Sequence, residues 1–184
     1  MKLLLTGAAS ACCDSRSAAR TFVACRYMYW SNDISSGPRL ERAGLDGIHR
    51  QTLVAEVLHV SSLTIDYSQH RLYWLSVDCN CIESSNMSGA DRQLLVTGLQ
   101  QPFGIAQYSD RVYWTDYRQQ SIESVDKQTG SNHHVVLDGV GFPIHLSIFH
   151  VSRQLGIYVM LLFRAALLIF YISCCLKFCW VSKK

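Results

Sequence analysis

Short runs of alternating apolar and polar residues, separated by small polar clusters, dominate the middle of the chain. The runs are rich in β-branched and aromatic residues, and the clusters in Ser, Asp, Gln, Gly and Asn. Between Gln101 and Leu137 there are four such runs, namely Gly104–Tyr108, Arg111–Asp116, Ser121–Asp126 and His134–Asp138. Alternation with a period of two, broken by short turns, is typical of an antiparallel meander. The pattern therefore predicts a four-stranded antiparallel sheet.

The same pattern occurs three times along the chain. Trp30, Trp74 and Trp114 are spaced by 44 and 40 residues. Each is followed by a glutamate behind an aliphatic residue, and then by a glycine that begins a four-residue phrase ending in Arg or His. These markers are Glu41, Glu83 and Glu123, and Gly47, Gly89 and Gly130. A period of about 40–45 residues with about four strands per unit is the signature of β-propeller blades. Since one such sheet cannot bury both of its faces, we expect the units to stack face to face.

The three units are not equally complete. The first runs from about Arg26 to Glu56, with Thr21–Ala24 as the remnant of an inner strand. The strands expected in the second unit are Leu63–Tyr67, Arg71–Leu75, Cys81–Asn86 and Gln93–Val96. After the third unit, Pro143–Phe149 repeats the phase of Pro102–Tyr108. It therefore predicts the first strand of a further blade.

A four-residue motif connects these repeats to a known family. The third unit contains Tyr113-Trp114-Thr115-Asp116, followed by a short turn, an Ile-Glu-Ser strand and a glycine turn. This arrangement resembles the YWTD repeat, or LDL-receptor class B repeat, of the low-density lipoprotein receptor-related protein family. The first unit, with Tyr29-Trp30-Ser31, matches it closely, whereas the second is degraded to Tyr73-Trp74-Leu75-Ser76. The resemblance covers about Arg26 to Gln154.

The resemblance implies an all-β fold: a partial YWTD β-propeller with about three four-stranded antiparallel blades in an open arc. In the family, six blades close a ring and cysteine-rich growth-factor-like modules follow, so the sequence is expected to be a fragment of one ring. The motif residues are expected to be structural, and Asp116 to tie neighbouring strands by hydrogen bonds. They are Tyr29, Trp30, Tyr73, Trp74, Tyr113, Trp114, Thr115, Asp116, Glu41, Glu83, Glu123, Gly47, Gly89 and Gly130. The ligand-binding residues are not identified by the resemblance.

The two ends of the chain differ in composition from the blades at 21–150. Residues 1–20 begin with an apolar run and contain Ala9-Ser10-Ala11, which fits a signal-peptide cleavage pattern; a disordered, non-native start is the alternative. After a linker at 151–156, Ile157–Leu176 holds one charged residue in a stretch long enough to cross a bilayer as a helix. The lysines of the basic tail, 177–184, predict a cytoplasmic end. The alternative is an aberrant tail on a truncated chain.

Composition narrows the function classes. Charged residues make up 17% of the chain and the net charge is +3, which argues against a nucleic-acid partner. The eight cysteines lie in separate groups without a paired CxxC spacing, and His133-His134 point to opposite faces of a strand, so no metal site is predicted. With no phosphate loop, paired carboxylates or recognisable nucleophile context, we expect no catalytic residues, no cofactor and no enzyme activity. Asn86-Met87-Ser88 is a candidate N-glycosylation site.

The sequence thus predicts a binding module. The family resemblance implies an extracellular part of an endocytic receptor that binds secreted protein ligands or lipoproteins through propeller loops, contacts neighbouring blades and is anchored in the membrane by its apolar helix. Two alternatives remain open. One is the propeller of a Wnt co-receptor, and the other is a truncated, non-functional receptor fragment.

Overall fold

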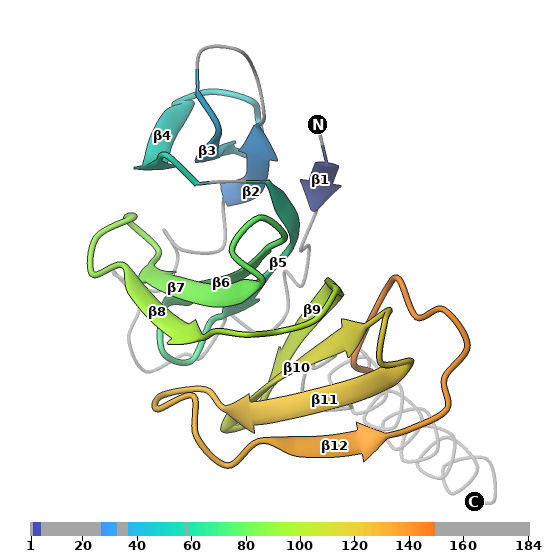
Figure 1. The fold of residues 1–184 in the computed structure, drawn as a ribbon. Helices are drawn as coiled ribbons and strands as arrows, with labels where there is room; N and C mark the ends of the chain where they lie inside the picture. Colours follow the sequence, from blue (N-terminus) through green and yellow to red (C-terminus); the bar gives the residue numbers. More distant parts are fainter. Residues whose placement is uncertain (1, 5–26, 33–36, 58, 150–184) are drawn as a thin grey trace, which may run out of the picture.

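A computed structural model describes residues 2–4, 27–32, 37–57 and 59–149 of the chain. In these ranges the chain forms three four-stranded antiparallel sheets, which follow one another as blades along an arc (Figure 1). Blade 1 consists of β1 (Lys2–Leu4), β2 (Tyr27–Asn32), β3 (Arg39–Gly44) and β4 (Gln51–Ala55). Blade 2 consists of β5 (Val60–Asp66), β6 (Arg71–Ser76), β7 (Cys81–Asn86) and β8 (Gln93–Val96). Blade 3 consists of β9 (Pro102–Tyr108), β10 (Arg111–Asp116), β11 (Ser121–Asp126) and β12 (His134–Leu137). Within these ranges, the prediction of an all-β fold with three four-stranded blades is confirmed.

The innermost strand of blade 1 differs from the expectation. Lys2–Leu4, in the stretch expected to be signal-like or disordered, pairs antiparallel with β2, with Leu3 opposite Trp30. The expected remnant strand Thr21–Ala24 lies outside the described residues. Without β1, the inner edge of β2 would present unpaired N–H and C=O groups. An extended segment can pair with this edge wherever the segment comes from in the sequence.

The segment after blade 3 is not a strand, so the prediction for Pro143–Phe149 is wrong in its secondary structure. The segment nevertheless passes beside β9, because a Cβ atom placed on Gly104 would lie only 2.8 Å from the amide nitrogen of Leu146. A strand needs a hydrogen-bonded partner, and in the part of the chain that the structure describes no strand of a further blade is available to pair with it.

The predicted helix Ile157–Leu176, the linker before it and the basic tail after it lie outside the described residues. Within the ranges that are described, no helix has the length and hydropathy needed to cross a membrane.

The hydrophobic core lies between the blades and is built from the two faces of each sheet. Tyr29 packs in the cluster between blades 1 and 2 together with Trp74, and Tyr73 packs between blades 2 and 3 together with Trp114. Because successive side chains of a strand point to opposite faces, Tyr29 and Tyr73 contact the following blade, and Trp74 and Trp114 contact the preceding one. Trp74 and Trp114 are fully buried. The motif is therefore what joins the blades into an arc.

Candidate functional site

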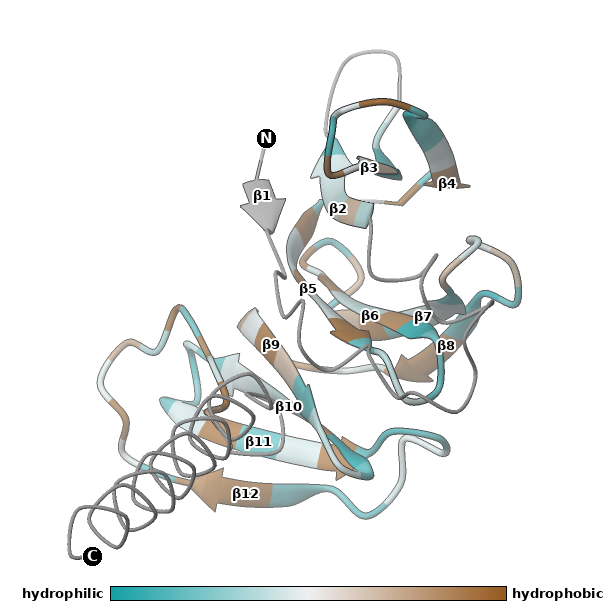
Figure 2. Cartoon of the chain, turned by 180° about the vertical axis from the view of Figure 1, so that it is seen from behind, coloured by the Kyte–Doolittle hydropathy of each residue, from teal (hydrophilic) through white to brown (hydrophobic). Residues whose placement is uncertain are grey.

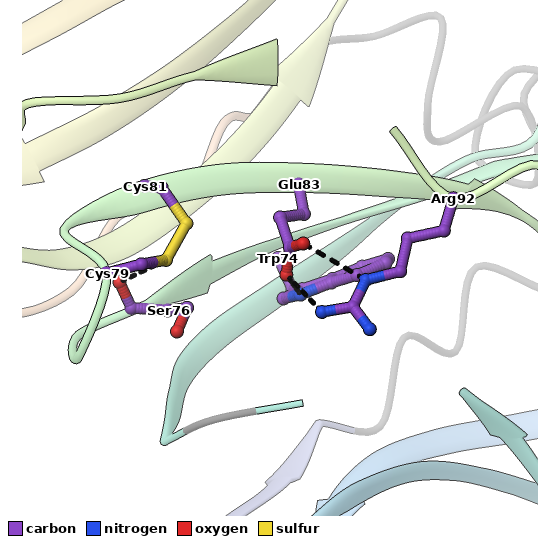
Figure 3. Close-up of a disulfide and its surroundings, with 6 residues drawn as sticks. All are labelled: Trp74, Ser76, Cys79, Cys81, Glu83 and Arg92. Carbon is purple, nitrogen blue, oxygen red and sulfur yellow. Dashed lines mark hydrogen bonds and ion pairs between the residues drawn. A yellow bond between two sulfur atoms is a disulfide. The ribbon is translucent and has the colours of Figure 1, made fainter. Parts of the chain in front are cut away.

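A polar cluster recurs in each blade, beside the motif tryptophan. Trp30 lies opposite Glu41 in the strand register, and Trp74 lies opposite Glu83. In both pairs the indole Nε1 donates a hydrogen bond of 3.0 Å to Oε2 of the glutamate. An arginine from the end of the glycine phrase completes the cluster. Figure 3 shows this for Arg92, whose Nε donates to Oε1 of Glu83 over 3.0 Å.

The carboxylate of Glu41 stays ionised in the folded protein. Burial raises its pKa, but hydrogen bonds from Arg50, Asn32 and Arg39 outweigh that effect and hold the pKa at about 2. The shortest of these bonds runs from an Arg50 guanidinium nitrogen to Oε2 over 2.8 Å. This carboxylate has no proton to give at neutral pH. Its partners lie in β2, in β3 and directly before β4, so its role is that of a structural anchor.

Blade 3 carries a variant of the cluster. His133 stands where the other blades have arginine, and its Nε2 lies 2.6 Å from Oε2 of Glu123. Its ring stacks on Trp114 with centroids 5.5 Å apart. Trp114 Nε1 has no hydrogen-bond partner in the described part of the chain. The sequence shows that the last residue of each glycine phrase is arginine or histidine. The contact of this residue with the glutamate of its blade was not predicted from the sequence.

Asp116 organises one end of blade 3. Its Oδ1 accepts hydrogen bonds from the backbone N–H groups of Arg118 and Gln119, both at 3.0 Å. Its Oδ2 accepts from the N–H groups of Gln100 and Gln101, both at 3.1 Å. One buried carboxylate thus fixes the β10–β11 turn against the connection that leads into β9.

Three aromatic side chains gather beside the β10–β11 turn, from β9, from the turn itself and from the segment after β12. Tyr117 contacts Phe103 with ring centroids 5.7 Å apart and Phe142 with centroids 5.2 Å apart. Phe142 is 63% exposed, whereas Phe103 and Tyr117 are half-buried beneath it. We call these three residues the aromatic trio. Exposed aromatic rings on rigid loops are typical of protein recognition surfaces.

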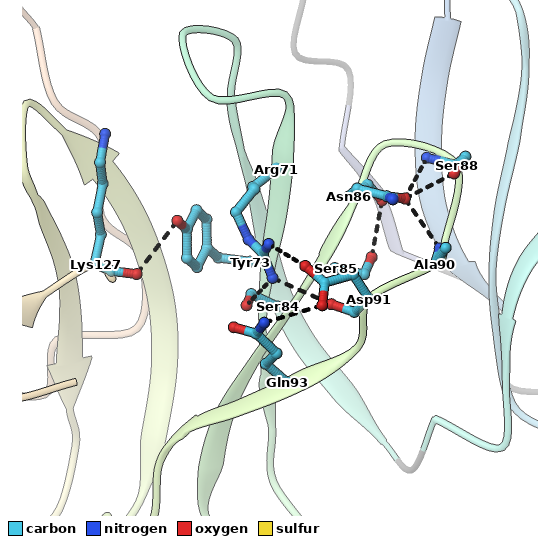
Figure 4. Close-up of polar contacts among 10 residues, drawn as sticks. All are labelled: Arg71, Tyr73, Ser84, Ser85, Asn86, Ser88, Ala90, Asp91, Gln93 and Lys127. Carbon is cyan, nitrogen blue, oxygen red and sulfur yellow. Dashed lines mark hydrogen bonds and ion pairs between the residues drawn. The ribbon is translucent and has the colours of Figure 1, made fainter. Parts of the chain in front are cut away.

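The turn at Asn86 is well ordered by its own hydrogen bonds (Figure 4). Oδ1 of Asn86 accepts from the N–H and hydroxyl of Ser88, at 3.0 and 2.7 Å, and from the N–H of Ala90 at 2.9 Å. Among the described residues, none accepts a hydrogen bond from Asn86 Nδ2. The nitrogen that would carry a glycan is therefore not engaged, and Ser88 is exposed.

A disulfide joins Cys79, in the turn between β6 and β7, to Cys81, the first residue of β7 (Figure 3). Cys79 is exposed and Cys81 is buried. This pairing was not predicted, although the two cysteines are separated by Asn80 alone. Among the described residues, no group of three His, Cys, Asp or Glu side chains is placed to hold a metal ion.

Comparisons with known proteins identify sequence relatives of these blades. No protein-family model matches the chain. Low-density lipoprotein receptor-related protein 5 is 46% identical over 120 residues in both mouse and human, which covers 65% of this chain. These blades are repeats of the low-density lipoprotein receptor-related protein family. Human low-density lipoprotein receptor-related protein 4, another member, is 37% identical over 94 residues, or 51% of this chain. The chain spans only 7% and 5% of the lengths of these two relatives.

Solved structures agree with the fold described for these blades. A chain in the crystal structure of a nidogen/laminin complex matches with a TM-score of 0.53 and 26% identity, covering 59% of this chain and 42% of that one. A TolB-like protein from Agrobacterium tumefaciens matches with a TM-score of 0.54 over 61% of this chain and 46% of its own, but at 10% identity it supports the fold alone.

Proposed function

We propose that the chain is an extracellular ligand-binding module of a receptor-related protein and that it binds secreted proteins through the loops at the Asp116 end of its blades. The aromatic trio carries this proposal, because its exposed ring, Phe142, packs on Tyr117 in the turn that the buried Asp116 carboxylate holds in position. Receptor-related names among the relatives and a disulfide at Cys79–Cys81 support a secreted setting, since disulfides persist in oxidising compartments. We further propose that Ile157–Leu176 anchors the module in the membrane.

Replacing Phe142 with alanine is expected to weaken capture of secreted proteins at least tenfold. Truncating an exposed aromatic anchor removes contact area with a partner, and hot-spot anchors cost about 2 kcal/mol or more when truncated, which exceeds the roughly 1.4 kcal/mol of a tenfold change. The measurement is binding of biotin-labelled proteins from conditioned medium to the immobilised full chain, quantified by mass spectrometry. Phe149→Ala is the matched control, because Phe149 is an exposed phenylalanine outside the trio. Equal capture by Phe142→Ala and the unchanged chain would contradict the proposed surface.

We propose that Asn86 carries an N-linked glycan when the chain enters the secretory pathway. Its turn is exposed and its Nδ2 points to no described acceptor, so a glycan can be accommodated after folding. Expression in secretory cells should give a band that glycosidase shifts by one glycan, and Asn86→Gln should abolish the shift. Ser88→Thr keeps the acceptor motif and should retain it. An unchanged band after glycosidase treatment of the native chain would refute the modification.

A further inference from the structure

The outer face of blade 3 exposes residues whose counterparts are buried between blades. Leu137 lies opposite Ile122 in the register, as Val54 lies opposite Leu40 in blade 1. Val54 is 6% exposed, but Leu137 is 53% exposed. Figure 2 shows that the end of β12, the last strand of blade 3, is apolar. Blade 3 therefore has a face built to contact a following blade.

The opposite face of blade 1 shows the complementary pattern. Leu45, Met87 and Lys127 are equivalent, since each directly follows the last paired residue of β3, β7 and β11. Met87 is 8% exposed and Lys127 is 6% exposed, because each packs against the preceding blade, whereas Leu45 is 62% exposed. Blade 1 therefore has a face built to contact a preceding blade.

The glycine phrases mark where such a contact would form. A Cβ atom on Gly89 would clash with the carbonyl oxygen of Leu53 in blade 1, and one on Gly130 with that of Leu95 in blade 2. Both glycines let their turn approach the outer strand of the preceding blade. Gly47 has the same left-handed conformation, but a Cβ atom there would meet nothing within 4 Å. The residue of blade 3 in register with Leu53 and Leu95 is Val136.

The length of one matched chain gives an expected number of blades in a closed ring. The part matched in the nidogen/laminin complex is 59% of 184 residues, about 109, and it forms 42% of that chain, which therefore has about 260 residues. At the 40- to 44-residue spacing of the tryptophans, this length holds about six units. The three described blades are about half of such a ring.

We propose that two copies of this chain close head to tail into one ring of about six blades. Blade 3 of each copy would pack on blade 1 of the other, so that the same contact forms twice and the ring is closed by a two-fold axis. Gly47 of one copy would approach the Val136 carbonyl of the other, and Leu45 would lie over Tyr108. The proposed contact uses the same strand positions as the two interfaces already present in each arc, between blades 1 and 2 and between blades 2 and 3.

An ion pair between blades 2 and 3 supplies a sharp test. Lys127 Nζ lies 2.6 Å from Asp66 Oδ2, and both side chains are buried. Across the proposed contact, Leu45 is equivalent to Lys127 and Tyr108 is equivalent to Asp66. Leu45→Lys and Tyr108→Asp alone each place an unpaired charge in the contact. The two substitutions together in one chain recreate the ion pair at both contacts of the dimer.

The measurement is sedimentation equilibrium of the full chain in mild detergent over a range of concentrations. We expect the native chain to be a dimer. Either single variant should raise the dissociation constant of the dimer at least tenfold, and the double variant should restore the dimer. Gly47→Ala should also weaken the dimer, whereas Gly98→Ala should not. These two glycines have φ angles of 80° and 77° and nothing within 4 Å of an added Cβ, so the local strain is matched.

Three outcomes would overturn the proposal. A native chain that stays monomeric would show that a second copy does not cover these faces. A series of growing oligomers would show a head-to-tail contact that fails to close. Single variants that dimerise as tightly as the native chain would place the dimer contact elsewhere, including in the apolar tail.

Discussion

Replacing Lys127 with methionine is expected to lower the free energy of unfolding by about 3–5 kcal/mol. The ammonium group of Lys127 is the partner of Asp66, which is nearly inaccessible to water between blades 2 and 3. Burial raises the pKa of Asp66, and the hydrogen bonds from Lys127 and Ser68 outweigh it, so that the pKa is lowered overall. Without the lysine, a buried carboxylate is left uncompensated. Urea unfolding followed by tryptophan fluorescence measures the change, since Trp74 and Trp114 lie in the two interfaces of blade 2.

Two further variants show whether the loss comes from the unpaired charge. Combining Lys127→Met with Asp66→Asn removes both charges and should recover a large part of the stability. Asp91→Asn removes the carboxylate of a surface pair with Arg71 and should leave the urea midpoint nearly unchanged, because exposed pairs are screened by water. A loss from Lys127→Met as small as that from Asp91→Asn would show that the buried pair does not hold blades 2 and 3 together.

Acidification from pH 4.5 to pH 2 is expected to remove about 3 kcal/mol of stability through Glu41 alone. Its pKa is about 2 in the folded protein and 4.5 in a free side chain. Because the folded value is the lower one, the stabilisation is fully present above pH 4.5 and is lost as pH falls towards 2. Urea midpoints of the native chain and of Glu41→Gln, measured between pH 7 and pH 2, give the contribution as the difference between the two curves.

The exposed carboxylate of Glu56 provides the control for acidification. Glu56→Gln should follow the native curve, because Glu56 is exposed and belongs to no cluster. The native and Glu41→Gln curves should converge as pH falls below 4.5. Parallel curves down to pH 2 would mean that the arginines around Glu41 do not stabilise its ionised form.

Local patterns were enough to predict most of the fold. The predicted bounds of β7, β8 and β11 agree with the structure, because alternation and turn residues are encoded in a few neighbouring positions. The family was also predicted correctly from the YWTD motif. The strand at Lys2–Leu4 could not be predicted in this way, since its partner β2 is more than twenty residues away and selects it through an open edge.

The candidate site was less accessible to sequence reasoning. The pair Asp66–Lys127 joins residues 61 positions apart, and no local pattern signals it. The clusters of Glu41 and Glu83 required the strand register, which places each glutamate opposite a tryptophan. The aromatic trio combines residues from β9, the β10–β11 turn and the segment after β12, and only the fold brings these together.

The opposite orientation of tyrosine and tryptophan in each motif gives a blade a front and a back. Any arc taken from such a ring ends in one tyrosine face and one tryptophan face, whichever blades it contains. A ring with this polarity can be opened at any connection between blades and still present the same pair of complementary ends. Circularly permuted chains that begin at Val60 or at Pro102 of a completed ring would therefore be expected to fold with the blade-to-blade contacts unchanged.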